Sequence, residues 1–293
     1  MDQFDCGTRI LRLIHGRVAR GAFQSDPLRR GILIDRCTEM NVRTYLDRIN
    51  YDGPLEPTAE ALRRLQVAHL LAVPFENLSI HAREPIVLDD QALFQKIVSR
   101  RRGGFCYELN GLFAALLRAM GFEVVMLSAQ VANADDQFSP DFDHMALMVT
   151  VDEPCVVDVG FGDSFVEPLS LNERASQVQG DRAYRVDADG ERLVVMQRSE
   201  VGTGDEWRPQ YRFTLRPYEY SDYAERCEYH QTSPLSHFTK TRICSRLTPR
   251  GRITLSDMRF ITTEGAARGE RPVATREEYG DVLREHFGIV LSQ

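Results

Sequence analysis

The hydrophobic pattern of the chain changes near Gly121. Before this glycine, apolar residues recur at helical spacing, as Val42, Tyr45, Leu46 and Ile49 do, and this spacing places them on one face of a helix. After it, apolar residues gather in short runs that are typical of β-strands. Helices and strands that are segregated along a chain indicate an α+β fold. The sequence therefore predicts a helical region followed by a mainly β region.

The same patterns predict individual elements. Helices are expected over residues 41–49, 58–73, 91–101 and 106–120, with Thr58 as an N-cap and Gly121 at a helix C-terminus. Strands are expected over residues 123–131, 144–151, 155–159, 183–186, 192–197 and 211–215, and such a series of short strands favours an antiparallel barrel. Beyond Pro217 we expect a helix over 219–229, a polar loop over 230–238, strands over 243–247, 252–255 and 258–262, and a closing helix over 275–287.

These elements divide the chain into four segments. Residues 1–39 are rich in arginine and are expected to be either an N-terminal extension or the result of an upstream start codon, with the functional domain starting at Met40. Intact mass of the native protein distinguishes the two, since the products differ by about 39 residues. Residues 40–121 are predicted to form a helical bundle, residues 122–216 a β-barrel and residues 217–293 a small α/β region.

Composition excludes several functions. The 293 residues carry a net charge of -7, whereas nucleic-acid binding favours a basic surface. No apolar run approaches the roughly 18–20 residues of a membrane helix, and no secretory signal is recognisable. The six cysteines are dispersed without a metal-ligand pattern, which indicates a reduced, cytoplasmic protein without a metal site. No phosphate-binding glycine loop is present.

The stretch Arg102 to Gly111 carries the strongest chemical signal. Two glycines precede Cys106, and an apolar run that suits a buried helix follows it. A thiol in the first turn of a helix lies near the positive end of the helix dipole, which favours the nucleophilic thiolate. A buried structural cysteine is the alternative interpretation.

A nucleophilic cysteine needs a base and a group that orients the base. His144 starts the strongest predicted strand, and Asp158 lies near the end of the next one. Their even separation places both side chains on one face if the two strands pair, although the register is not determined by the sequence. A core histidine and a turn carboxylate are the corresponding structural alternatives.

Taken together, these motifs resemble the arylamine N-acetyltransferase family. The resemblance rests on R-G-G-F-C-Y-E-L-N at 102–110, H-M at 144–145, D-V-G-F-G at 158–162 and V-P-F-E-N-L at 73–78. A weaker match continues into Pro234, Ser236 and Phe238. Thr232-Ser233-Pro234 departs from the Thr-His-Pro that is frequent in the family near coenzyme A, and no residues that contact coenzyme A are assigned.

The resemblance implies a helical bundle, a β-barrel and an α/β lid around a cysteine-protease-like core. It implies that Cys106, His144 and Asp158 form a triad that moves an acetyl group from acetyl-CoA to an arylamine, arylhydrazine or N-hydroxyarylamine through an acetyl-cysteine. Phe75 and Phe161 are candidates for the wall of the acceptor pocket, with core packing as the alternative. Arg102 and Glu108 are expected to hold the loop by an ion pair rather than to contact substrate.

Three other functions use or retain the same residues. An amide synthase would release a polyketide from a carrier protein, and a thiol hydrolase would use water in place of the amine. A degenerate binding module is the non-enzymatic alternative. The physiological acceptor, the acyl-chain preference and the oligomeric state are not determined by the sequence.

Overall fold

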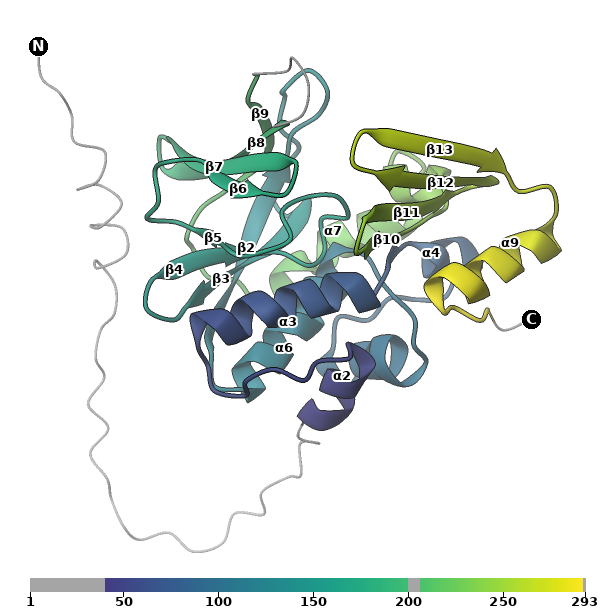
Figure 1. Ribbon diagram of the computed structural model, residues 1–293, viewed down its shortest axis with the longest axis horizontal. Coiled ribbons are helices and arrows are strands. Elements are labelled where there is room, and N and C mark those ends of the chain that lie inside the picture. Colours follow the sequence, from purple (N-terminus) through teal and green to yellow (C-terminus); the bar gives the residue numbers. More distant parts are fainter. Residues whose placement is uncertain (1–39, 200–205, 292–293) are drawn as a thin grey trace, which may run out of the picture. The chain divides into compact units, whose positions relative to one another are not determined.

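The computed structural model describes residues 40–199 and 206–291 (Figure 1). The predictions about residues 1–39 lie outside this range. The helices of the first part are α2 (Val42–Arg48), α3 (Ala59–Ala72), α4 (Leu78–Ala82), α5 (Asp90–Phe94), the π-helix η1 (Gln95–Ser99) and α6 (Cys106–Ala119). Thr58 caps α3 as predicted, because its side chain accepts a hydrogen bond from the Ala61 amide at 3.2 Å.

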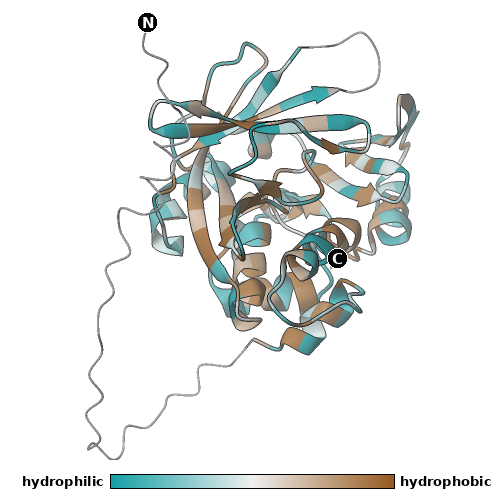
Figure 2. Cartoon of the chain, turned by 60° about the vertical axis from the view of Figure 1, so that its left-hand side comes forward, coloured by the Kyte–Doolittle hydropathy of each residue, from teal (hydrophilic) through white to brown (hydrophobic). Residues whose placement is uncertain are grey.

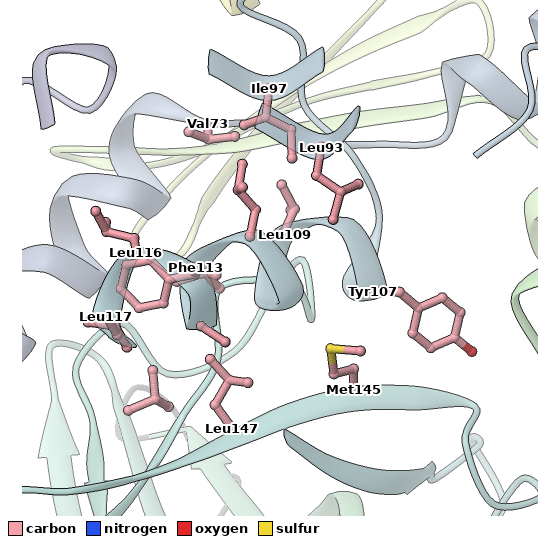
Figure 3. Close-up of a cluster of buried hydrophobic side chains, with 14 of the residues drawn as sticks. Val73, Leu93, Ile97, Tyr107, Leu109, Phe113, Leu116, Leu117, Met145 and Leu147 are labelled. Carbon is pink, nitrogen blue, oxygen red and sulfur yellow. The ribbon is translucent and has the colours of Figure 1, made fainter. Parts of the chain in front are cut away.

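Helix α6 forms the centre of the main hydrophobic core. Every residue from Cys106 to Leu117 is buried, so the helix has no solvent-exposed face in its first three turns. A helix of this kind is stable only when other elements enclose it. Figure 3 shows its side chains, Phe113 among them, between Met145 and Leu147 of the sheet and side chains of the other helices. This packing holds Cys106 at a rigid position.

The central region is an eight-stranded antiparallel sheet in the order β5-β4-β3-β2-β9-β8-β7-β6. Its strands are β2 (Glu123–Val131), β3 (His144–Thr150), β4 (Pro154–Val157), β5 (Leu169–Ser170), β6 (Gln177–Gln179), β7 (Arg182–Asp189), β8 (Arg192–Ser199) and β9 (Arg208–Phe213). Strands such as β7 alternate between apolar and polar residues, and their colour changes along their length in Figure 2.

The two edge strands of this sheet meet through side chains. The Ser170 amide of β5 donates to Gln177 Oε1 of β6 at 2.8 Å, and Gln177 Nε2 donates to the Ser170 carbonyl at 3.1 Å. Because the edges are bridged in this way, the sheet is a nearly closed barrel, and the predicted central barrel is confirmed.

The C-terminal region combines short helices with a second sheet. It contains the 3-10 helix η2 (Tyr220–Tyr223), α7 (Ala224–Thr232), α8 (His237–Lys240), β10 (Ile243–Thr248), β11 (Gly251–Ser256), β12 (Arg259–Glu264), β13 (Ala267–Pro272), α9 (Arg276–Val282) and the π-helix η3 (Leu283–Phe287). Helix α9 lies beside the sheet of β10 to β13 (Figure 1). Side chains of α9 and η3 form a second core with Leu255 and Phe260 of this sheet. The fold class predicted from the sequence is confirmed, with an N-terminal helical part, a barrel and an α/β lid.

The lid sheet also takes a strand from the helical part. Strand β1 (Phe75–Glu76) pairs with β10, so the order of the sheet is β1-β10-β11-β12-β13. This pairing connects the segment before Cys106 to the C-terminal region. The domain boundaries at residues 121 and 216 remain a prediction.

Three details differ from the predicted elements. The polar loop expected over 230–238 is partly helical, because α7 continues to Thr232 and α8 begins at His237. Strand β13 was not predicted, because all six of its residues are exposed and it has no apolar face. The helix expected over 91–101 ends in a π-helical turn. No helix in residues 40–199 or 206–291 is long and apolar enough to cross a membrane.

Candidate active site

The glycine turn before Cys106 lies against strand β1. A Cβ atom on Gly103 would lie 1.9 Å from the Pro74 carbonyl oxygen, so only glycine fits there. The Glu76 amide donates to the Gly104 carbonyl at 2.8 Å. The turn therefore leads directly into α6, of which Cys106 is the first residue.

Two buried ion pairs hold this turn. Arg102 binds Glu76 with an N–O distance of 2.9 Å, and Lys96 binds Glu108 at 2.6 Å. Glu108 also accepts a hydrogen bond from the Phe105 amide at 3.1 Å, which satisfies an N–H group at the start of α6. Arg102 and Glu108 thus hold the loop as expected, but through two separate ion pairs with different partners.

His144 and Asp158 meet at the end of the β3–β4 ladder. The ladder pairs Leu147 with Val157, and the same register places Asp158 opposite Ala146, two residues from His144 and on the same face. His144 Nε2 lies 2.7 Å from Asp158 Oδ2, and both side chains are buried. When Nε2 carries the proton and donates to Asp158, Nδ1 has the lone pair of a base.

Asn110 of α6 fixes this pair from the helix side. Its Nδ2 donates to Asp158 Oδ1 at 2.9 Å and to the Met145 carbonyl at 2.6 Å, and its Oδ1 accepts from the Val159 amide at 2.8 Å. Gly160 completes the contact, because a Cβ atom there would lie 2.8 Å from both Cys106 Cα and Asn110 Nδ2. The N-terminal turns of α6 therefore hold the Cys106 thiol and the Asp158 carboxylate in place together.

Cys106 and His144 line one cavity of about 340 Å³. Burial raises the pKa of the Cys106 thiol well above its ordinary value, and a hydrogen bond with the Met145 backbone acts in the opposite direction. The sequence led us to expect the helix terminus to favour thiolate. Desolvation is the largest influence on the pKa of this buried thiol, and it favours the protonated form. The thiol therefore needs a base that takes its proton.

The candidate acceptor residues Phe75 and Phe161 both line this cavity. The Phe161 ring lies 5.2 Å from the His144 ring, and the Phe75 ring lies 6.1 Å from Phe238 of α8. Asn77 ties the two segments together, since its Nδ2 donates to the Phe238 carbonyl at 2.9 Å. The V-P-F-E-N-L motif thus contributes a wall residue, the ion-pair partner of Arg102 and an anchor for α8.

A charged cluster that we did not predict also lines the cavity. Arg226 of α7 donates to Asp143 Oδ1 through Nε at 2.8 Å, and His230 Nε2 lies 3.2 Å from the same oxygen. Burial acts to raise the pKa of Asp143, but His230 and Arg226 hold it well below its ordinary value. Asp143 precedes His144 directly, so a second carboxylate lies close to the candidate thiol and base. The sequence signals for this cluster were weak, because Asp143 is 83 or more residues from Arg226 and His230.

Within the described part of the chain, no three His, Cys, Asp or Glu side chains gather closely enough to hold a metal ion. The cavity presents the Cys106 thiol and the His144 imidazole, and the buried Asp158 carboxylate lies 2.7 Å from that imidazole. This combination suits nucleophilic acyl transfer, in which a thioester forms on the cysteine.

Comparison with known proteins identifies the family. A family model described as N-acetyltransferase matches residues 58–293. The chain is 32% identical over 277 residues to arylamine N-acetyltransferase 2 of Mus musculus. The alignment covers 87% of this chain and 96% of the relative. The chain is also 32% identical over 248 residues to proansamycin X synthase of Amycolatopsis mediterranei, covering 82% of this chain and 94% of that protein.

The fold agrees with a solved structure of the same kind. The arylamine N-acetyltransferase of Mycobacterium marinum in complex with CoA superposes with a TM-score of 0.78 at 32% identity, covering 85% of this chain and 93% of that one. On the family model, these relatives and the shared fold, the chain belongs to the arylamine N-acetyltransferase family.

Proposed function

We propose that this protein transfers an acetyl group from acetyl-CoA to the nitrogen of an arylamine, arylhydrazine or N-hydroxyarylamine. The observation that carries the proposal is that Cys106 and His144 line one cavity, with Asp158 Oδ2 2.7 Å from His144 Nε2. The family supports the acyl donor, because a relative with this fold is known in complex with CoA.

In the first half-reaction, Cys106 Sγ attacks the thioester carbon while its proton passes to His144 Nδ1. Asp158 stabilises the imidazolium that results, and Asn110 and the Gly160 amide keep its carboxylate in place. Backbone N–H groups near Cys106 stabilise the oxyanion. The carbon–sulfur bond to coenzyme A then breaks, and the leaving thiolate takes the proton from His144.

In the second half-reaction, the acceptor nitrogen attacks the acetyl-cysteine carbonyl. An aromatic amine is weakly basic, so its lone pair is free at neutral pH, and His144 accepts the proton that the nitrogen loses. Cys106 leaves as a thiolate and recovers a proton from His144. Phe75, Phe161 and Phe238 supply an aromatic surface for a flat acceptor, and Asp143 and Arg226 are polar residues of the same lining.

The four cysteines that the structure describes are all unpaired, which supports a reducing compartment. We infer a cytoplasmic enzyme on this basis.

The amide synthase remains the second candidate, since one relative is named proansamycin X synthase. A large polyketide donor needs a wide cleft, whereas the cavity at Cys106 is about 340 Å³. A drug-sized ligand occupies a pocket of about 300–1,000 Å³, so the cavity suits a small acyl group with one aromatic acceptor. This size favours the acetyltransferase.

A panel of acyl donors and amine acceptors tests the proposal, with Cys106→Ala as the control. Acetyl-CoA with arylamines is expected to give the highest kcat/KM. Asp158→Asn should reduce kcat by about 10⁴ while the protein stays folded, because the imidazole loses its orienting partner. Preference for long acyl thioesters would favour the amide synthase, and ester hydrolysis that added amine does not accelerate would favour the hydrolase.

A further inference from the structure

Asp143 is a second carboxylate on the active-site cavity, outside the triad. It stands directly before His144, and both residues line the cavity with Cys106. Neighbouring residues of a regular strand point to opposite faces, so a turn is needed for both to reach the same space. Strand β3 begins only at His144, and Phe142 has a positive φ of 63°, which turns the chain just before the strand. Asp143 therefore reaches the cavity from the turn and His144 from the strand.

Two buried side chains hold this turn. Tyr107 Oη donates to the Phe142 carbonyl at 2.5 Å, and the Phe142 amide donates to Ser128 Oγ at 2.8 Å. A bulky residue with a positive φ is strained, and such a conformation persists only where the surrounding structure imposes it. The fold thus fixes the backbone of Asp143 next to the triad.

Asp143 is held as a carboxylate with one oxygen open. Arg226 donates to Oδ1 through Nε at 2.8 Å and through Nη2, and His230 Nε2 lies 3.2 Å from the same oxygen. Burial acts to raise the pKa of Asp143, but these partners hold it well below its ordinary value. In the part of the chain that the structure describes, no hydrogen bond reaches Oδ2. That oxygen can therefore accept a hydrogen bond from a substrate, and Asp143 takes no proton at neutral pH.

The charge of Asp143 acts at the reacting sulfur. Burial is the largest cause of the raised pKa of the Cys106 thiol, and Asp143 adds to it more strongly than Asp158 does. A negative charge at this place opposes formation of the thiolate, but it favours any step in which positive charge develops beside the sulfur. The attack of a neutral amine is such a step, because the nitrogen becomes positive as its bond to carbon forms.

We propose that Asp143 is a catalytic residue of the second half-reaction, in which Oδ2 accepts a hydrogen bond from the attacking nitrogen of the acceptor. This inference rests on the proposed function, because that function supplies the acetyl-cysteine. As the nitrogen–carbon bond forms, one proton of the nitrogen passes to His144 Nδ1. The carbon–sulfur bond then breaks, and His144 returns this proton to the Cys106 sulfur. A primary amine or a hydrazine keeps a second N–H, which points to Asp143 throughout.

The carboxylate also influences which nucleophile takes the acetyl group. Coenzyme A returns to the acetyl-cysteine as a thiolate, and its negative charge is repelled by Asp143. A neutral nitrogen becomes positive during its attack and is stabilised by the same charge. Asp143 therefore favours transfer to nitrogen over reversal of the first half-reaction.

The test measures both attacks on one acetyl-enzyme. The protein is acetylated with acetyl-CoA, separated from the donor by gel filtration, and mixed with either an arylamine or coenzyme A. Rapid quenching and mass spectrometry then give the rate at which Cys106 loses its acetyl group. In Asp143→Asn the rate with the arylamine should fall about tenfold, and the rate with coenzyme A should rise roughly two- to tenfold.

Asp141→Asn is the matched control. It removes the same charge two residues away, where the side chain is 51% exposed, pairs with Arg192 at 3.1 Å and lies outside the cavity lining. Both rates should stay within about twofold of wild type, because an exposed charge is screened by water and salt.

The directions of the two rates separate a catalytic role from a structural one. Asp143 and Arg226 also join the start of β3 to α7, and a purely structural pair would slow both attacks in Asp143→Asn. Rates that fall together, or that match those of Asp141→Asn, would overturn the role of Asp143 while the acetyl-enzyme still supports the proposed function. A wild-type protein that forms no acetyl-enzyme would overturn the proposed function, and this inference with it.

Discussion

Asn110→Ala is expected to weaken both the fold and the catalytic geometry. Asn110 is completely buried and makes three hydrogen bonds, to the Met145 carbonyl, to Asp158 and from the Val159 amide. Alanine leaves the carbonyl and the amide without partners and removes one of the donors to a buried carboxylate. No polar group nearby replaces the amide side chain, so the structure has to relax around a small gap.

The size of the effect follows from these three contacts. A buried polar group that loses its partner costs about 1–3 kcal/mol, and a bond to a charged group contributes about as much. The three contributions sum to about 3–9 kcal/mol. We take about 4 kcal/mol from the lower part of this range, because the structure relaxes around the gap, and this is a large part of the 5–15 kcal/mol that stabilises a typical protein. With an m-value of about 3 kcal/mol/M, the midpoint of urea unfolding falls by roughly 1.3 M. A looser Asp158 should also lower kcat at least tenfold.

Urea unfolding followed by circular dichroism measures this change. Asn172→Ala is the matched control, because Asn172 is exposed and donates to Glu153 at 3.2 Å. That variant should lose less than about 0.5 kcal/mol. Asn110→Asp should be at least as unstable as Asn110→Ala, since it adds a buried charge beside Asp158. If Asn110→Ala loses as little free energy of unfolding as Asn172→Ala, the hydrogen bonds of Asn110 do not hold the site together.

Three further predictions concern charges around Cys106. Asp143→Asn should speed alkylation of Cys106 by iodoacetamide at neutral pH, and Arg226→Gln should slow it, each by roughly two- to tenfold. The reason is that the Asp143 charge disfavours the thiolate and Arg226 compensates that charge. A change of the alkylation rate in the same direction in both variants would contradict this. Glu76→Gln should cost about 3–5 kcal/mol in urea unfolding, because the buried Arg102 charge then keeps only the more distant and exposed Glu84, 3.7 Å away. Glu60→Gln, which breaks an exposed pair with Arg63, should cost less than about 1 kcal/mol. Similar losses in the two variants would refute the role of burial. In His144→Gln, alkylation of Cys106 should require a pH above 9.0, the ordinary pKa of a thiol, because the raised pKa keeps the buried thiol protonated at lower pH. Wild type should react near neutrality. Coinciding pH profiles of the two proteins would show that His144 is not the base.

The elements with strong periodic patterns were predictable from the sequence. Cys106 opens α6, Thr58 caps α3, and the strands expected over 243–262 correspond to β10, β11 and β12. The even separation of His144 and Asp158 placed them on one face, which the β3–β4 register confirms. These features depend on local spacing, and local spacing is what a sequence records most directly.

Features that depend on distant partners were not predictable. Strand β1 has two residues and exists because it pairs with β10, about 170 positions later. Arg226 meets Asp143 across 83 positions, and Arg252 meets Asp163 across 89. Asn110 lies within the recognised motif, but its contacts became visible only once β3, β4 and α6 were in place. Strand β13 lacks the apolar alternation that marks a strand, because it is a charged edge.

The most direct test of the account is the covalent state of Cys106. The protein is incubated with acetyl-CoA without acceptor, quenched in acid and digested, and the peptide that contains Cys106 is examined by mass spectrometry beside Cys106→Ala. We predict one acetyl group on Cys106, which disappears when an arylamine is added before the quench. Absence of this adduct, together with acetyl transfer that persists in Cys106→Ala, would contradict the mechanism.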